Sequence, residues 1–151
     1  MEILVEKGLR RLTLMRDGET PLVFPIALGK SPEGHKEREG DNRTPEGEYF
    51  VCTRNDKSKF HLALGLSYPN PEDASAALLR SEITPEQHDA ICAAHKIRRR
   101  PPWDTPLGGF IMIHGGGTAS DWTAGCIALS NEDIDILFSL CPMGTAVRIV
   151  P

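Results

Sequence analysis

The sequence predicts a mainly β fold with α elements, built as one domain over residues 1–151. Short apolar runs bounded by Gly, Pro and polar turns occur before residue 70 and after residue 108, which is typical of β-strands. Residues 72–100 have a helical composition instead, so we expect a helical insertion there. The chain of 151 residues is long enough to bury one core, and its 40% hydrophobic and 25% charged residues are ordinary for a globular protein.

The first strands are predicted as a hairpin. Residues 11–15, RLTLM, alternate apolar and polar side chains, and Asp17-Gly18 supplies a tight turn before the apolar run PLVFPIAL at 21–28. Residues 30–48 are polar and rich in Gly and Pro, which indicates a long surface loop.

Two further strands are expected after this loop. They are EYFVCTR at 48–54 and KFHLALGLSY at 59–68.

The predicted insertion contains two helical segments, PEDASAALLR and TPEQHDAICAAHKIR. In the second, Thr84 is a suitable N-cap, Pro85 fits the first turn and Gln87 completes a capping box. Pro101-Pro102 then prevents the helix from continuing.

Strand structure returns after the insertion. GFIMIH at 109–114 ends at a histidine, and CIAL at 126–129 is a short strand. Ser130 is placed to cap a last helix, with Asp133 at its third position, and AVRIV at 146–150 closes the chain as a strand.

Charge and hydropathy exclude two classes of partner. The formal net charge is −4, so a general affinity for nucleic acid is not expected. The basic run at 96–100 suits the C-terminal end of a helix, and a patch for an anionic partner is the alternative. No stretch approaches the ~18 apolar residues of a membrane span.

One histidine and one cysteine near the C-terminus are candidate catalytic residues. Thiolate is the reactive form of cysteine, and a histidine can take the thiol proton and later return it. His114 ends one predicted strand and Cys126 begins the next, so the two strand ends could meet. The alternative from residue types alone is a buried structural cysteine and a loop histidine.

The surrounding stretch resembles a known family. TAGCIALSNED at 123–133 resembles the signature S/T-H-G-C-I-R-L-S-N-x-D of the L,D-transpeptidase (YkuD) family, and IHG at 113–115 resembles its upstream histidine segment. LGKSPEGHKEREGDNRTPEGEYFV at 28–51 is similar to another family segment. The resemblance covers nearly the whole chain and implies a mixed β-sandwich-like domain, with the helices at about 72–100 as an elaboration.

The resemblance also implies catalytic roles. Cys126 would be the nucleophile and His114 the base, while the carbonyl of Gly115 would orient the histidine ring. The reaction implied is acyl transfer on peptidoglycan stem peptides through a thioester on the cysteine.

A second group of residues would bind the substrate. Backbone amides around Thr123, Ala124 and Gly125 would hold the oxyanion, and Gly125 would leave that side of the backbone open. Trp122 would either form a wall of the cleft or simply pack against its neighbours.

Two positions depart from the family signature. Ala124 replaces its usual histidine and Ala128 its usual arginine. The first change removes a ring beside the oxyanion site, and the second removes a guanidinium that could steer a carboxylate. We therefore expect a variant site in which substrate and acyl acceptor differ more than the thiol chemistry does.

The sequence is also compatible with other functions. Water as acceptor would make the enzyme an L,D-peptidase or amidase, and a non-catalytic wall-binding module is a further alternative. His88, Cys92 and His95 lie on one helix face and could bind zinc, but Ile91 and Ala94 alongside favour packing. We predict no metal and no cofactor.

The location is predicted in two ways. The resemblance implies the periplasm or cell wall, whereas the first residues, MEILVEKGLRR, contain no signal-peptide core. A cytoplasmic protein and a chain trimmed to its mature part are both compatible with this, and nothing in the sequence specifies the oligomeric state.

Overall fold

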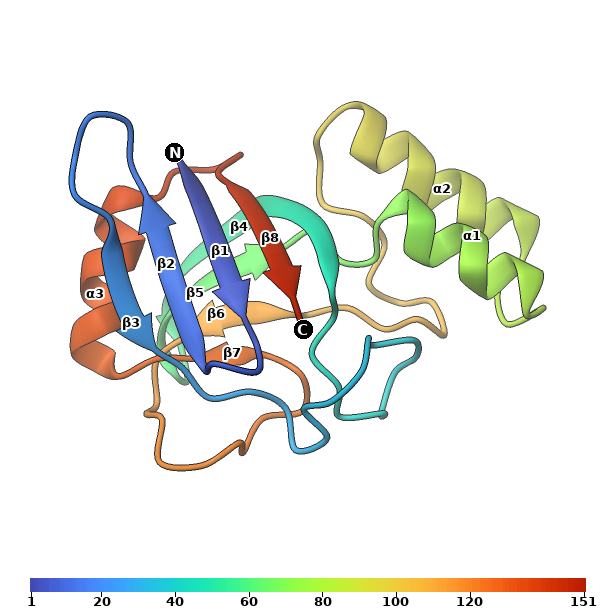
Figure 1. The fold of residues 1–151 in the computed structure, drawn as a ribbon. Coiled ribbons are helices and arrows are strands. Elements are labelled where there is room, and N and C mark those ends of the chain that lie inside the picture. The colour runs from blue at the N-terminus through green and yellow to red at the C-terminus, as the bar shows by residue number, and fades with distance from the viewer.

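The computed structural model describes all residues from 1 to 151, and its main feature is an eight-stranded sheet that folds over on itself (Figure 1). The strand order is β3-β2-β1-β8-β4-β5-β6-β7. β4 is the longest strand and belongs to both halves, pairing with β8 on one side and β5 on the other. The strands are β1 Glu2–Glu6, β2 Arg11–Met15, β3 Leu22–Pro25, β4 Gly47–Ser58, β5 His61–Leu66, β6 Met112–His114, β7 Ile127–Ala128 and β8 Ala146–Val150.

The two layers enclose one main core. Their inward-facing side chains, among them Leu12, Leu64, Ile113 and Ile127, are fully buried in a cluster of 26 residues. Helix α3, Asn131–Leu140, adds Ile134 and Leu137 to this cluster and contacts β5 and β6. The predicted mainly β class and the mixed, two-layered architecture are therefore confirmed.

The predicted hairpin of β2 and β3 is confirmed, with Gly18 in the left-handed region at φ 72°. The second strand ends at Pro25, three residues earlier than the sequence suggested. The chain then leaves β2 and forms isolated bridges from Ala27 to Ala128 and from Gly29 to Thr123. This segment thus connects one edge strand of the sheet to the other.

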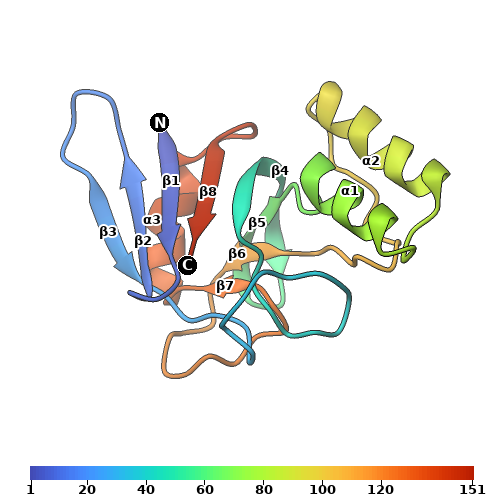
Figure 2. The same ribbon diagram turned by 45° about the vertical axis from the view of Figure 1, so that its right-hand side comes forward.

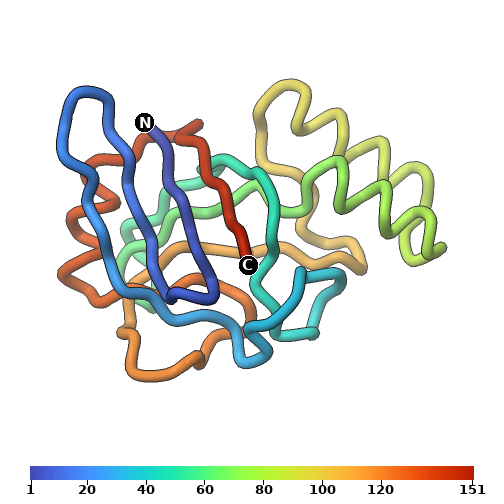
Figure 3. Tube along the Cα trace, in the orientation of Figure 1, coloured from blue at the N-terminus to red at the C-terminus, as the bar shows by residue number.

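Strand β1 was not predicted. It lies between β2 and β8, antiparallel to the first and parallel to the second, with Glu2 opposite Ala146 and Glu6 opposite Val150 (Figure 3). Ile3 and Val5 point into the core, while the flanking glutamates are partly exposed. Its antiparallel partner β2 follows after a short turn in which the Arg10 amide donates to the Lys7 carbonyl at 3.0 Å, whereas β8 comes from the other end of the chain.

The helical insertion is confirmed as α1, Pro71–Leu79, and α2, Pro85–Lys96. Both begin with a capping box, at Asn70 and at the predicted Thr84. The two helices pack on each other at one end of the sheet (Figure 2). None of the three helices in the structure has the length and apolar character needed to cross a bilayer.

Candidate functional site

The structure places His114 at the end of β6 and Cys126 directly before β7, the neighbouring strand. β6 and β7 are parallel, with Ile113 opposite Ile127 and His114 opposite Ala128. The paired isoleucines face the core, so His114 and Ala128 belong to the opposite face of this pair. Cys126 lies two positions before Ala128, the strand partner of His114. No hydrogen bond joins the sulfur to the imidazole.

His114 is held rigidly and is only 2% exposed. Its Nδ1 lies 2.6 Å from the carbonyl oxygen of Gly115, and because a carbonyl only accepts, Nδ1 carries the proton. The ring stacks on Phe60 at 4.6 Å and meets the edge of Trp122 at 5.5 Å. Nε2 has no partner and is the unprotonated nitrogen of the neutral ring.

Burial lowers the pKa of His114 below its ordinary value of 6.5, and the hydrogen bond to Gly115 only partly opposes this. The imidazole is therefore neutral at pH 7 and able to accept a proton at Nε2.

Trp122 packs on the histidine. Its ring also meets Phe60 at 5.1 Å, and its Nε1 donates to the carbonyl of Gly117 at 3.0 Å. Trp122 does not line the pocket at Cys126, and its contacts are with the His114 and Phe60 rings.

Cys126 is surrounded mainly by backbone. Its sulfur accepts from the amide of Met112 and donates to the carbonyl of Phe110, both at 3.3 Å. Phe110 has φ 56°, a left-handed conformation that is uncommon for a bulky residue, and its side chain is 61% exposed. This backbone conformation accompanies the contact between the Phe110 carbonyl and the sulfur.

Burial raises the pKa of the Cys126 thiol above its ordinary value. The Met112 amide and the positive charge of Lys36 act in the other direction but do not outweigh burial. The sulfur is therefore a neutral thiol at pH 7. A neutral thiol fits the expectation that a histidine would have to take its proton before the sulfur reacts.

A small pocket of about 200 Å³ opens at Cys126. It lies between the loop predicted at 30–48 and the segment that leads into β6. Its lining consists of Lys36, Glu39, Gly40, Gly108, Gly109, Phe110, Ile111, Ala124 and Cys126.

Two of the three amides expected at the oxyanion site are already engaged. The Thr123 amide donates to the carbonyl of Leu28 at 3.3 Å, and the Gly125 amide donates to Oγ1 of Thr123 at 3.1 Å. The Thr123 hydroxyl in turn donates to the carbonyl of Cys126 at 2.7 Å. The amides of Ala124 and Cys126 have no protein partner, so they are the donors left for a substrate oxygen.

Gly125 is required by packing. Its φ is +140°, and a Cβ there would lie 2.8 Å from the carbonyl oxygen of Arg43 and 3.0 Å from Cδ1 of Ile111. The missing side chain thus lets another loop of the protein approach, whereas the sequence suggested that it left space for the substrate.

The two departures from the family signature have different surroundings. Ala128 is fully buried and exchanges both backbone hydrogen bonds with Ala27 at 2.9 Å. A guanidinium at this position would have no space, so the arginine expected from the resemblance could not steer a carboxylate in this chain without rearrangement. Ala124 is exposed at the rim of the pocket, where a larger side chain would fit.

Sequence reasoning missed several residues of the site. One of them is Phe60, whose ring stacks on the imidazole of His114. Asp121 is another, because it accepts from the Leu28 amide at 2.9 Å and from Nε and Nη2 of Arg10 at 3.1 and 2.8 Å. These partners are 93 and 111 residues away in the chain, so no local pattern could have revealed the contact. Lys36, in a polar loop, looked like a solvated surface lysine.

The alternative zinc ligands do not converge. His95 Nε2 lies 2.8 Å from the carbonyl of Ser67 and 2.9 Å from that of Pro69. Cys92 lies 3.7 Å from His88, and no group of three metal-binding side chains is found in the structure.

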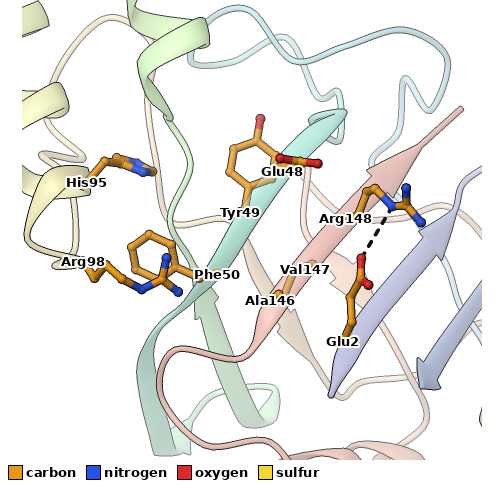
Figure 4. A pocket seen from close by; sticks show the side chains of 9 residues that line it. All are labelled: Glu2, Glu48, Tyr49, Phe50, His95, Arg98, Ala146, Val147 and Arg148. Atoms are coloured by element: carbon orange, nitrogen blue, oxygen red, sulfur yellow. Dashed lines mark ion pairs between the residues drawn. The ribbon is translucent and has the colours of Figure 1, made fainter. Parts of the chain in front are cut away.

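A separate pocket of about 450 Å³ lies between α2 and the strands β1, β4 and β8 (Figure 4). Three of its charged groups have partners within the protein: Arg148 lies 3.5 Å from Glu2, and Arg98 lies over the ring of Phe50 at 4.3 Å. It contains no cysteine.

A family model described as an L,D-transpeptidase catalytic domain (YkuD) matches residues 1–149. The chain belongs to the YkuD family. This family acts on peptidoglycan, and its members are typically found in the cell wall or periplasm. No curated protein matched the chain.

Solved structures share the fold of this family member. Pgp2 of Campylobacter jejuni, described as a helical cell shape determining protein, aligns with a TM-score of 0.63 and 23% identity over 97% of this chain. Bd1075 of Bdellovibrio bacteriovorus aligns at 0.60 and 24% over 99%. L,D-transpeptidase 1 of Mycobacterium tuberculosis aligns at 0.57 and 12% over 99%.

The chain spans only part of each of these proteins, 46%, 47% and 61% of their lengths in the same order. At these identities the likeness concerns the fold alone.

Proposed function

We propose that residues 1–151 form a single catalytic domain that transfers acyl groups on peptidoglycan stem peptides, with Cys126 as nucleophile and His114 as base. The observation that carries this proposal is the fixed histidine with a free Nε2 on β6, the strand that pairs with β7, which Cys126 directly precedes. Family membership supports the substrate class.

The first step is attack by sulfur on the amide carbonyl that follows the L-centre of the stem. Since thiol and imidazole are both neutral at rest, Nε2 takes the thiol proton as the carbon–sulfur bond forms. The sulfur must leave its contacts with Phe110 and Met112 to do so. The amide carbon–nitrogen bond then breaks, the imidazolium returns the proton to the departing amine, and a thioester remains on the cysteine.

The oxyanion formed in this step needs hydrogen-bond donors. The free amides of Ala124 and Cys126 are available at the pocket, and losing one such donor typically costs ~10²–10³ in rate. The hydroxyl of Thr123 and the amide of Gly125 brace the loop that presents them.

The second step passes the acyl group to an amine or to water. Transfer to an amine makes a crosslink or attaches a protein, and transfer to water makes the protein an L,D-peptidase. We propose a periplasmic or cell-wall location, as is typical of the family.

Incubation with muropeptides followed by mass spectrometry of protein and products tests the proposal. We expect an acyl adduct on Cys126 and loss of the terminal D-residue. Cys126→Ala should abolish turnover, at least ~10³-fold, and His114→Gln should lower it ~10²–10⁴-fold. Cys92→Ala, which changes a cysteine outside the pocket, serves as the matched control and should retain turnover.

The product pattern separates the alternatives. Crosslinked products indicate transfer, and tripeptides without crosslinks indicate hydrolysis. Binding of muropeptides with no product, unchanged in Cys126→Ala, would contradict the proposal and indicate a wall-binding module.

A further inference from the structure

Lys36 is a charged residue inside the pocket of the nucleophile. Its side chain is only 3% exposed, yet it lines the same pocket of about 200 Å³ as Cys126. Its ammonium donates to the carbonyl of Arg38 at 3.1 Å and to Oδ1 of Asp41 at 2.9 Å. An ammonium has three N–H donors, so one of them has no protein partner.

The surroundings hold this ammonium in place. Burial acts to raise the pKa of Asp41, but hydrogen bonds from Lys36 and from the amides of Glu37 and Arg43 outweigh it and lower that pKa. Asp41 is therefore a carboxylate with donors on both oxygens. It anchors the lysine without offering a site for further ligands.

The loop is also tied to the helical insertion through the residue before the lysine. Nδ1 of His35 accepts from the amide of Glu46 at 2.7 Å, and its Nε2 lies 2.7 Å from Oδ1 of Asp73, at the start of α1. The segment that carries Lys36 is thus held by the loop residue Glu46 and by Asp73 of the helical insertion.

We propose that Lys36 is a specificity-determining residue that binds the free C-terminal carboxylate of the acyl donor through its third N–H. This inference rests on the proposed function and names the feature of the stem peptide that the pocket selects. A donor whose terminal residue ends in a free carboxylate is bound, and a donor with a neutral or extended C-terminus is not.

The size of the pocket indicates which carboxylate of the stem peptide Lys36 binds. At about 200 Å³ it is smaller than the ~300–1,000 Å³ of sites that enclose a whole small ligand, so it accommodates about one residue of the stem. In the residue to be expelled, only the amide nitrogen and one α-carbon separate the carboxylate from the attacked carbonyl. A side-chain carboxylate of the residue before the scissile bond lies farther from that carbonyl.

Charge also restricts where an anion can sit. Glu39 lines the pocket together with Lys36, so an anion is favoured beside the lysine and opposed beside the glutamate. A free ammonium donor in a buried position gives a charge-assisted hydrogen bond, which is stronger than a neutral one.

The test compares two tetrapeptide donors, one with a free C-terminal carboxylate and one with a C-terminal amide. kcat/KM is measured for thioester formation by the unsubstituted protein and by Lys36→Met. We expect the unsubstituted protein to prefer the free acid about 10- to 100-fold, the range of a hydrogen bond between charged groups. In Lys36→Met this ratio should fall to near one. The ratio is independent of the fraction of protein that is folded.

Lys7→Met is the matched control. Lys7 is also 3% exposed, and its ammonium holds the same loop through the carbonyls of Gly34 and Thr44, but it does not line the pocket. Its removal should leave the acid-to-amide ratio unchanged even if stability falls. An equal change of that ratio in both variants would overturn the proposal.

A third donor distinguishes the two sources of carboxylate. It keeps the free C-terminus and carries an amide in place of the side-chain carboxylate before the scissile bond. Lys36→Met should remain defective with this donor. If the defect instead disappears with this donor and persists with the C-terminal amide, Lys36 binds the side chain and our assignment is wrong.

Binding separates this inference from the proposed function. Calorimetry with Cys126→Ala should show tighter binding of the free acid than of the amide, and Lys36→Met on that background should remove the difference. Equal turnover of both donors by the unsubstituted protein overturns the role of Lys36 and leaves the proposed function standing. Lysine-dependent binding without any turnover supports the role of Lys36 and overturns the proposed function.

Discussion

The two halves of the candidate site are built in opposite ways. His114 is fixed by side chains, since Phe60 and Trp122 enclose its ring and one carbonyl orients it. Cys126 is fixed by backbone, since an amide and a carbonyl contact its sulfur and a glycine with a positive φ precedes it. His114 is a part of the packed interior, whereas Cys126 lines a pocket.

This difference teaches which changes each half tolerates. The side chains around His114 act through their volume and shape, so a substitution among them shifts the properties of the enclosed imidazole. The backbone around Cys126 instead depends on its φ and ψ angles and on the absence of Cβ atoms. We therefore expect the two halves to fail for different reasons.

The two alanines of the signature give the largest expected contrast. Ala128→Arg places a charged side chain at a fully buried bridge on the histidine side, and we expect a loss of about 3 kcal/mol or more in the free energy of unfolding. Ala124→His adds a ring at the exposed pocket rim and should change stability by less than about 0.5 kcal/mol. Urea denaturation measures both.

The same pair tests the meaning of the variant signature. Ala124→His supplies a further donor near the oxyanion and should raise the ratio of transfer to hydrolysis on a tetrapeptide donor. An Ala128→Arg protein as stable as the unsubstituted one would show that the buried bridge is not a constraint on this position.

A smaller effect is expected from glycines of the catalytic loop. In Gly125→Ala the alanine must adopt φ +140°, and its Cβ would lie 2.8 Å from the carbonyl oxygen of Arg43. We therefore expect a loss of about 1–3 kcal/mol in the free energy of unfolding, together with reduced acylation of Cys126. Gly117→Ala has a similarly positive φ of 109° but no atom within 4 Å, so it isolates the cost of the backbone angle. If the two variants are equally impaired, the approach of the loop at Arg43 contributes nothing.

The smallest change is expected on the histidine side. Phe60→Leu lets water nearer to the ring, which relieves the burial that lowers the pKa of His114. Activity requires the neutral imidazole and is lost as the pH falls through that pKa, which lies below 6.5 in the native protein. The acid limb of the pH–kcat/KM profile should therefore move to higher pH in Phe60→Leu.

Phe138→Leu is a suitable control, because Phe138 lies on α3, away from the site, and its ring packs under Arg54. An unchanged acid limb in Phe60→Leu would show that the stacked ring does not set the proton affinity of the base.

Much of the fold followed from local patterns. The helix caps at Thr84 and Ser130 and the turn at Gly18 were predictable because their hydrogen bonds or backbone angles involve residues within a few positions. Strand β1 was not predicted, because one of its edges pairs with β8 from the far end of the chain, although the other pairs locally with β2.

The site followed the same rule. The motif led us to expect Cys126 at the start of a strand next to that of His114, and Cys126 directly precedes β7 instead. The contact between the His114 ring and the Gly115 carbonyl is as the resemblance implied. The engaged amide of Thr123 and the buried position of Lys36 depend on Leu28 and Asp41, which only the folded chain brings close. Partnerships of this kind leave no local pattern in the sequence.

The bridge from Ala27 to Ala128 has a consequence for the order of folding. It closes a loop of about a hundred residues, and contacts of such separation form slowly because their entropic cost precedes their gain. The loop that carries Cys126 is anchored to the same segment through Thr123 and Leu28. Partly folded chains would therefore contain a hairpin and a helical pair but no oxyanion donors in place. The appearance of acylating activity during refolding would report the last stage of assembly, later than the recovery of helical or sheet signals.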